Sequence, residues 1–294
     1  MKNLAKHIRR VGLIANTDKA SSRRLVREAA RLLRSGRSTI LADTATARLA
    51  GLRCATSPDA PALARRVDLL LVFGGDGTML RVAREVAAHS PPILGINAGA
   101  LGFLTAVQAH QLRMALKQLS AGQTWTETRP LIQATGRVRG QDLSELALND
   151  FVITRGAAPR LIELDVWVDG EVLTRYRCDG LILCSPTGST AYSLSAGGAV
   201  VSPGAEVLTL TPISPHTLSN RSVIVSLRST VQVKVLSSRV ETILTADGQK
   251  TITLGAGDVV TIRRSRHSIP LVHLAGSSFF DTLRHKLHWS GSHV

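Results

Sequence analysis

A glycine-rich hexapeptide, Phe73-Gly74-Gly75-Asp76-Gly77-Thr78, combines backbone that can approach a ligand closely with one carboxylate. Five consecutive large apolar residues, Leu69 to Phe73, lead into it and predict a strand buried on both faces. Apolar residues at helical spacing, from Met79 to Ala87, predict a helix directly after it. Backbone N–H groups and the helix dipole favour an anion at such a junction, so we expect a phosphate loop consisting of Gly74, Gly75, Gly77 and Thr78.

Asp76 is the unusual residue of this loop. The hexapeptide is neither a Walker loop, which ends in Gly-Lys-Ser/Thr, nor a dinucleotide fingerprint, which needs a third glycine and an acidic residue further along. A carboxylate among phosphate-binding amides repels phosphate unless it faces Mg²⁺ or accepts the proton of a hydroxyl group. The loop therefore indicates phosphoryl transfer to an alcohol, with Asp76 as the catalytic residue. The alternative is a plain glycine turn in which Asp76 caps the helix.

A second cluster, Asp179 to Gly198, consists of an apolar strand followed by a long stretch of hydroxyl residues and glycines. Such a stretch offers many hydrogen-bond donors and acceptors in little space and would suit a ligand with several polar edges. A Ser/Thr-capped turn is the alternative, although polar loops of this length between apolar strands are uncommon without a function.

The elements that must position these two clusters differ in type. From Val11 to about Gly122, short apolar strands alternate with helical periodicity, which predicts a doubly wound α/β domain with a parallel sheet. Beyond Thr124 the apolar period becomes two, as in Ile162 to Val168, and Asp169-Gly170 supplies a hairpin turn. The tail from Ser278 to His288 is again helical. We expect an α/β domain of residues 1–124, with the tail 276–294 packing back on it, and a mainly β domain of residues 125–275.

Composition narrows the class of protein. The 294 residues include 36 Lys and Arg against 21 Asp and Glu, a net charge of +15 that would attract polyanions. With only 3 Trp, 2 Tyr and 5 Phe and no aromatic-basic repeat, nucleic acid is not the expected partner. No apolar run reaches the roughly 18 residues of a membrane helix, and the start has no signal-peptide core, so we expect a cytoplasmic protein. The three cysteines have no metal-ligand spacing and fit a reducing compartment.

These motifs together resemble the bacterial NAD kinases, which phosphorylate the 2′-hydroxyl of the adenosine ribose of NAD. The resemblance covers nearly the whole chain, and the block from Pro186 to Gly198 is its most specific part. The Gly74 to Thr78 motif on its own is shared with lipid and phosphofructo-type kinases. The remaining matching segments are Asn97 to Thr105, Asn149-Asp150, Pro215 to Ser219 and Phe279 to Trp289.

The resemblance implies a role for particular residues. Asp76 matches the aspartate that accepts the 2′-hydroxyl proton, and Gly77 lies beside it at the NAD site. Asn149 and Asp150 match the pair that holds the dinucleotide. The family more commonly has Glu at the second position, and Asp is one methylene shorter. A bridging water could therefore connect the Asp150 carboxylate to the dinucleotide. The other matching NAD-binding positions are Arg160, Arg177, Asp179, Thr190, Ala191, Tyr192, Ser193, Leu194, Ser195 and Gln249.

Several of these residues also have a simpler interpretation. Arg177 and Asp179, two apart on a strand, would share a face, where Arg177 could bind a phosphate or form a surface ion pair with Asp179. Tyr192 could stack on a base or fill the core. Asp247-Gly248-Gln249 could be a hairpin turn only.

The sequence thus predicts transfer of the γ-phosphoryl group of ATP, as its Mg²⁺ complex, to NAD at a cleft between the two domains, giving NADP. Mg²⁺ would enter with ATP, because no direct metal motif is present. The resemblance also implies a homodimer or homotetramer, with small-molecule partners and neither nucleic acid nor membrane. A lipid or sugar kinase with the same glycine loop and a non-catalytic polyanion-binding protein remain the alternatives. Polyphosphate as donor, NADH as acceptor and allosteric effectors are left open.

Overall fold

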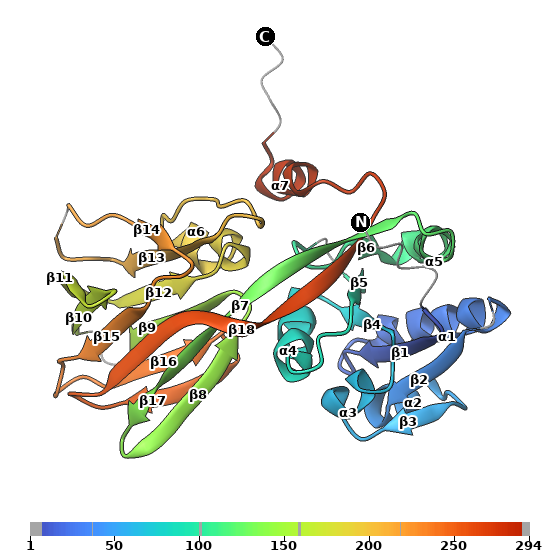
Figure 1. Ribbon diagram of the computed structural model, residues 1–294, viewed down its shortest axis with the longest axis horizontal. Coiled ribbons are helices and arrows are strands. Elements are labelled where there is room, and N and C mark those ends of the chain that lie inside the picture. Colours follow the sequence, from blue (N-terminus) through green and yellow to red (C-terminus); the bar gives the residue numbers. More distant parts are fainter. Residues whose placement is uncertain (1–7, 37, 100–101, 158–159, 218, 290–294) are drawn as a thin grey trace, which may run out of the picture. The chain divides into compact units, whose positions relative to one another are not determined.

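The computed structural model describes residues 8–36, 38–99, 102–157, 160–217 and 219–289 (Figure 1). The chain forms two compact units. The N-terminal unit contains the described residues of Met1–Thr128 and Ile269–Val294, and the β unit contains those of Arg129–Ser268. Two long strands, β7 (Thr124–Val138) and β18 (Val259–Leu274), carry the chain from one unit into the other.

The N-terminal unit is built on a parallel sheet in the order β5-β4-β1-β2-β3. Its strands are β1 (Arg10–Ala15), β2 (Thr39–Asp43), β3 (Ala55–Ser57), β4 (Leu69–Gly74) and β5 (Ile93–Asn97), with the short β6 (Val107–Gln108) and the end of β18 both parallel to β5. Leu69 to Phe73 are fully buried, which explains why this run contains no polar residue. The predicted α/β architecture with a parallel sheet is confirmed.

Helices connect these strands. They are α1 (Ala20–Ser35), α2 (Thr44–Ala50), α3 (Ala60–Ala64), α4 (Asp76–Val86), the 3₁₀ helix η2 (Ala109–Gln111), α5 (Leu112–Ser120) and α7 (Phe279–Leu287). α1 packs against α2 and α5, whereas α3 packs against α4. α1 buries a stripe that includes Leu25, Val26, Ala29 and Leu33 against one face of the sheet, as its helical spacing predicts. None of the described helices is both long enough and apolar enough to cross a bilayer.

The β unit is a sandwich of two antiparallel layers. One is a six-stranded sheet in the order β14-β13-β12-β9-β16-β17, and the other contains β11, β10 and β15 together with the parts of β7, β8 and β18 that lie in this unit. Apolar side chains from both layers form one core. The strands are β8 (Gln141–Ala147), β9 (Asp150–Arg155), β10 (Ile162–Val168), β11 (Glu171–Cys178), β12 (Gly180–Cys184), β13 (Val207–Ile213), β14 (Val223–Ser226), β15 (Val231–Val235), β16 (Thr242–Ala246) and β17 (Lys250–Leu254).

Along β10, the apolar residues that alternate in the sequence are also the residues that are buried. Ile162, Leu164 and Val166 are fully buried, and the hairpin at Asp169-Gly170 adopts positive φ angles of 52° and 88°, as a tight two-residue turn requires. The prediction of a mainly β second domain is confirmed.

The C-terminal helix α7 begins after Ser278, whose side chain accepts a hydrogen bond from the Asp281 N–H. The ring of Phe279 lies 6.4 Å from that of Phe103, centroid to centroid, and the Lys286 ammonium lies 5.9 Å from the Phe103 centroid. The predicted C-terminal helix is therefore present and contacts the loop that follows β5.

Candidate active site

The glycine loop has the predicted strand–loop–helix setting. Gly74 ends β4, Gly75 is the N-cap of α4 and Asp76 is its first residue. A Cβ on Gly74 would collide with the Thr78 side chain, which explains the need for glycine there. Thr78 is buried, whereas Gly77 is exposed.

The Asp76 carboxylate binds a different segment of the N-terminal unit. The Phe103 N–H donates to Oδ2 at 2.7 Å and the Leu104 N–H donates to Oδ1 at 3.2 Å. Gly102 lies so close that an added Cβ would collide with this carboxylate. No side chain caps the N-terminus of α4, so the alternative in which Asp76 is only a helix cap is wrong.

Asn97 anchors the segment that binds Asp76. It ends β5, next to Gly74 at the end of β4. Its side-chain oxygen accepts the Gly99 N–H at 2.6 Å and its amide donates to Thr105 Oγ1 at 2.9 Å. Two motifs that are about 25 residues apart thus meet at adjacent strand ends, the edge where parallel α/β sheets usually bind ligands.

The β unit brings four of the predicted NAD-binding residues into one pocket of about 440 Å³. They are Asn149, Asp150, Ala191 and Tyr192, and the pocket is completed by Val152, Thr154, Thr245, Asp247 and Gly248. Tyr192 is 46% exposed, so the alternative in which it fills the core is wrong.

Asp247 organises this pocket. Its carboxylate accepts the backbone N–H groups of Leu148, Asn149 and Asp150 at 3.1, 2.8 and 3.2 Å. The predicted hairpin turn is present, with φ angles of 49° and 63° at Asp247 and Gly248. Sequence reasoning missed the further role of Asp247, because the turn alone is sufficient to explain an Asp-Gly pair.

Asp150 is 4% exposed and lies near the Asp247 carboxylate. Burial raises the pKa of Asp150 to about 7, and the negative charge of Asp247 acts in the same direction. Near neutral pH, Asp150 can therefore donate a hydrogen bond as well as accept one.

The hydroxyl-rich segment serves mainly to hold the pocket wall. Both polar groups of Ser185 bind backbone: its Oγ donates to the Leu148 carbonyl at 2.5 Å and accepts the Gly188 N–H at 3.3 Å, and its N–H donates to the Asn149 carbonyl at 2.8 Å. Gly188 packs so closely on the Asn149 backbone that a Cβ would collide with it. Buried Ser193 hydrogen-bonds Thr211 at 2.9 Å. The hydroxyl groups of Ser185 and Ser193 therefore form hydrogen bonds within the protein, and Ala191 and Tyr192 are the residues of this segment that line the pocket.

The other predicted binding residues lie away from this pocket's lining. β11 ends at Cys178 and β12 begins at Gly180 in the other layer, so the expectation that Arg177 and Asp179 share a strand face is wrong. Arg177 is paired with Glu163 at 3.7 Å, and Asp179 is paired with Arg155 at 2.7 Å, which also contradicts an Arg177–Asp179 pair. Thr190 and Leu194 are half-buried, and Arg160, Ser195 and Gln249 are exposed.

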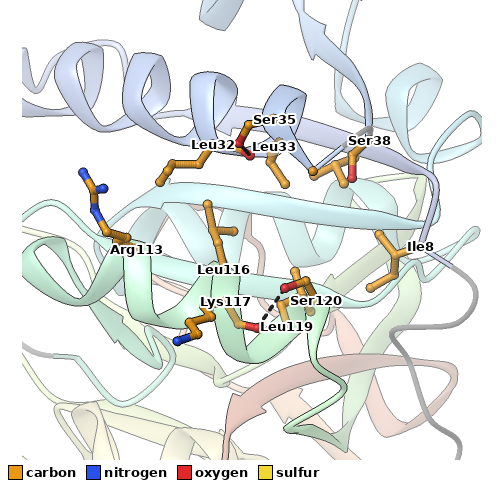
Figure 2. A pocket seen from close by; sticks show the side chains of 12 residues that line it. Ile8, Leu32, Leu33, Ser35, Ser38, Arg113, Leu116, Lys117, Leu119 and Ser120 are labelled. Carbon is orange, nitrogen blue, oxygen red and sulfur yellow. Dashed lines mark hydrogen bonds between the residues drawn. The ribbon is translucent and has the colours of Figure 1, made fainter.

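A separate cavity of about 480 Å³ lies in the N-terminal unit between α1 and α5 (Figure 2). Leucines of both helices line it, and Arg113 and Lys117 extend from α5 beside them. None of the residues predicted for chemistry lines it, and no Asp or Glu is among the described residues that do. We assign it no part in the reaction.

Comparison with known proteins agrees with this geometry. Residues 11–124 match the ATP-NAD kinase N-terminal domain and residues 148–274 match the ATP-NAD kinase C-terminal domain. The NAD kinase of Moorella thermoacetica is 41% identical over 97% of this chain and 91% of its own, and that of Thiobacillus denitrificans is 40% identical over 95% and 96%.

Solved structures give the same result. A yeast NADH kinase complexed with NADH superimposes with a TM-score of 0.89 at 28% identity, over 98% of this chain and 89% of its own. An NAD kinase from Archaeoglobus fulgidus in complex with ATP has a TM-score of 0.75 at 27% identity, over 96% of this chain and all of its own. The two family matches, the sequence identities and the shared fold together show that this chain belongs to the ATP-NAD kinase family.

Proposed function

We propose that this protein transfers the γ-phosphoryl group of ATP to the 2′-hydroxyl of the adenosine ribose of NAD, giving NADP and ADP. Membership of the ATP-NAD kinase family supports the reaction. The observation that carries the chemical assignment is the Asp76 carboxylate, held beside the phosphate loop by two backbone N–H groups.

Asp76 acts as the general base. Oδ1 accepts the Leu104 N–H and the Thr105 hydroxyl, whereas Oδ2 accepts only the Phe103 N–H among the bonds to described residues and keeps a lone pair that can accept the proton of a ribose hydroxyl. As that proton moves to Asp76, the 2′-oxygen forms a bond to the γ-phosphorus and the bond from phosphorus to the bridging oxygen of ADP breaks. The fixed orientation of the carboxylate serves this step, because phosphoryl transfer depends chiefly on positioning and on stabilising charge.

The pocket of the β unit binds the dinucleotide. Asn149 offers an amide, Asp150 a carboxyl group near its titration point, and Tyr192 an exposed ring on which a base can stack. Asp247 keeps the Asn149 and Asp150 backbone in place. Arg177, exposed on β11, is proposed to bind a phosphate of NAD. The remaining proposed contacts are Gly77, Arg160, Asp179, Thr190, Ser193, Leu194, Ser195 and Gln249.

Mg²⁺ is proposed to enter bound to ATP. Among the described residues, no group of three or more His, Cys, Asp and Glu side chains could hold a metal ion. Mg²⁺ commonly binds through substrate phosphates, water and one or two carboxylates, so it can enter with ATP without a cluster of protein ligands. When bound, the ion neutralises phosphate charge.

We also propose that the protein is a homodimer or homotetramer and that it is cytoplasmic. Val172 on the edge strand β11 and Ile224 on the edge strand β14 are 74% and 49% exposed, and exposed apolar side chains at sheet edges favour contact with another chain. The three cysteines are free, which suits a reducing compartment. Sedimentation of the purified protein measures the number of subunits.

The test of function is incubation of the purified protein with NAD, ATP and Mg²⁺, followed by a dehydrogenase assay that responds only to NADP. We expect NADP to accumulate with time and enzyme concentration. A panel that replaces NAD with lipid or sugar alcohols tests the kinases that share the glycine loop. Failure to form NADP, together with phosphorylation of one of those acceptors or salt-sensitive binding of nucleic acid, would refute the proposal.

A further inference from the structure

The carboxyl ends of three strands of the N-terminal unit are hydrogen-bonded into one edge. After β1, the Asn16 N–H donates to the Phe73 carbonyl of β4 at 2.8 Å. After β5, the Ala98 N–H donates to the Gly74 carbonyl at 3.2 Å, and the Ser21 hydroxyl of α1 donates to the Ala98 carbonyl at 3.1 Å. The segment between β1 and α1 is thereby fixed beside the phosphate loop.

Lys19, the residue before α1, lies in this fixed segment. Its Nζ is 3.8 Å from the position that a Cβ would occupy on Gly75, and 3.3 Å from the corresponding position on Gly99. The side chain is half-buried, and its ammonium forms no hydrogen bond or ion pair with any residue that the structure describes. The Lys19 ammonium is partly desolvated and lies next to two glycines, Gly75 and Gly99. Its charge favours binding of an anion, and the missing side chains provide the space for one.

We propose that Lys19 binds phosphate oxygens of the donor nucleotide, a residue role that rests on the proposed kinase function. Gly75 immediately precedes Asp76, so a phosphate held by Lys19 lies next to the carboxylate that takes the proton of the acceptor. The ammonium offsets the repulsion between that carboxylate and the phosphate. The donor is preferred over the pyrophosphate of NAD because the phosphoryl group must be transferred beside Asp76.

Steady-state kinetics with ATP and NAD varied separately test this role. Loss of a charged hydrogen bond in Lys19→Met should raise the KM for ATP about 10- to 100-fold and leave the KM for NAD unchanged. Lys19→Arg, which keeps the charge, should restore most of the affinity for ATP. Arg31→Met is the matched control: it removes a positive charge from an exposed position about 18 Å further along α1 and should behave like the unaltered protein.

Binding of inorganic tripolyphosphate with Mg²⁺, measured by calorimetry, provides a readout independent of catalysis. We expect Lys19→Met to weaken it by a similar factor and Arg31→Met to leave it unchanged. Lys19→Gln replaces Lys19→Met if thermal melting shows that the methionine variant does not fold. An unchanged KM for ATP, or a rise in the KM for NAD alone, overturns the assignment. An unaltered protein that makes no NADP yet binds tripolyphosphate through Lys19 refutes the proposed reaction while retaining the phosphate site.

Discussion

The backbone N–H of Phe103 donates a 2.7 Å hydrogen bond to Oδ2 of Asp76, joining two segments of the N-terminal unit that lie 27 residues apart. The ring of the same Phe103 contacts Phe279 of the C-terminal helix. The position of the proposed base therefore depends on the loop after β5, and that loop in turn packs against the end of the chain.

Replacement of Asp76 tests the base directly. Asp76→Asn retains the size of the side chain but cannot accept a proton at neutral pH, so turnover should fall about 100-fold or more while the Kd for NAD remains close to its original value. Asp142→Asn, at an exposed position of β8, is the control and should retain full turnover. Near-normal turnover in Asp76→Asn would remove this residue from the chemistry.

Replacement of Gly102 tests whether the loop positions Asp76. The Cβ of Gly102→Ala would collide with the Asp76 carboxylate, so the carboxylate or the loop must shift, at a cost of up to about 1–3 kcal/mol in the free energy of unfolding, and turnover should fall. Gly204→Ala is the control, since nothing lies within 4 Å of its Cβ position. Thermal melting and turnover of the two variants should differ; equal values would show that the close approach has no consequence.

The buried Asp150 predicts a pH dependence of stability. Its pKa rises from the ordinary 3.8 to about 7 on folding. Between these values the unfolded chain loses the proton that the folded protein keeps, so the free energy of unfolding falls as pH rises from about 4 to about 7, by up to roughly 4 kcal/mol. Below and above that range this residue contributes no slope.

Asp150→Asn should remove this part of the pH dependence and be relatively more stable at pH 8 than at pH 5 when compared with the unaltered protein. Denaturant unfolding across the range measures it, with the exposed Asp142→Asn as the control. Parallel profiles for the unaltered protein and Asp150→Asn would show that Asp150 ionises normally in the folded state.

Arg177 and Arg175 form a matched pair on β11. They are 62% and 63% exposed, and each pairs with an acidic residue of β10. Surface ion pairs contribute little, so Arg177→Gln and Arg175→Gln should both leave stability nearly unchanged. If Arg177 binds a phosphate of NAD, its replacement alone should raise the Kd for NAD about 10-fold or more. Equal affinities in the two variants would make Arg177 an ordinary surface residue.

The local pattern of apolar and polar residues was sufficient to predict most of the strands and helices. The apolar run before Gly74, the helical spacing after it and the alternation from Ile162 to Val168 are set by which faces must be buried, and burial is a property of neighbouring residues along the chain. The same reasoning located the strand–loop–helix setting of Asp76 and both Asp-Gly hairpins.

Contacts between distant segments required the tertiary structure. Asp247 binds the backbone of Asn149 across 98 positions of sequence, and Asp179 pairs with Arg155 rather than Arg177 because the chain changes layers after Cys178. Sequence alone determined that a carboxylate follows two glycines at a strand end. Only the folded chain decided that Phe103 and Leu104 orient that carboxylate and that the Lys19 ammonium lies beside Gly75, because hydrogen bonds and charges depend on distance in space and leave no periodic signal along the chain.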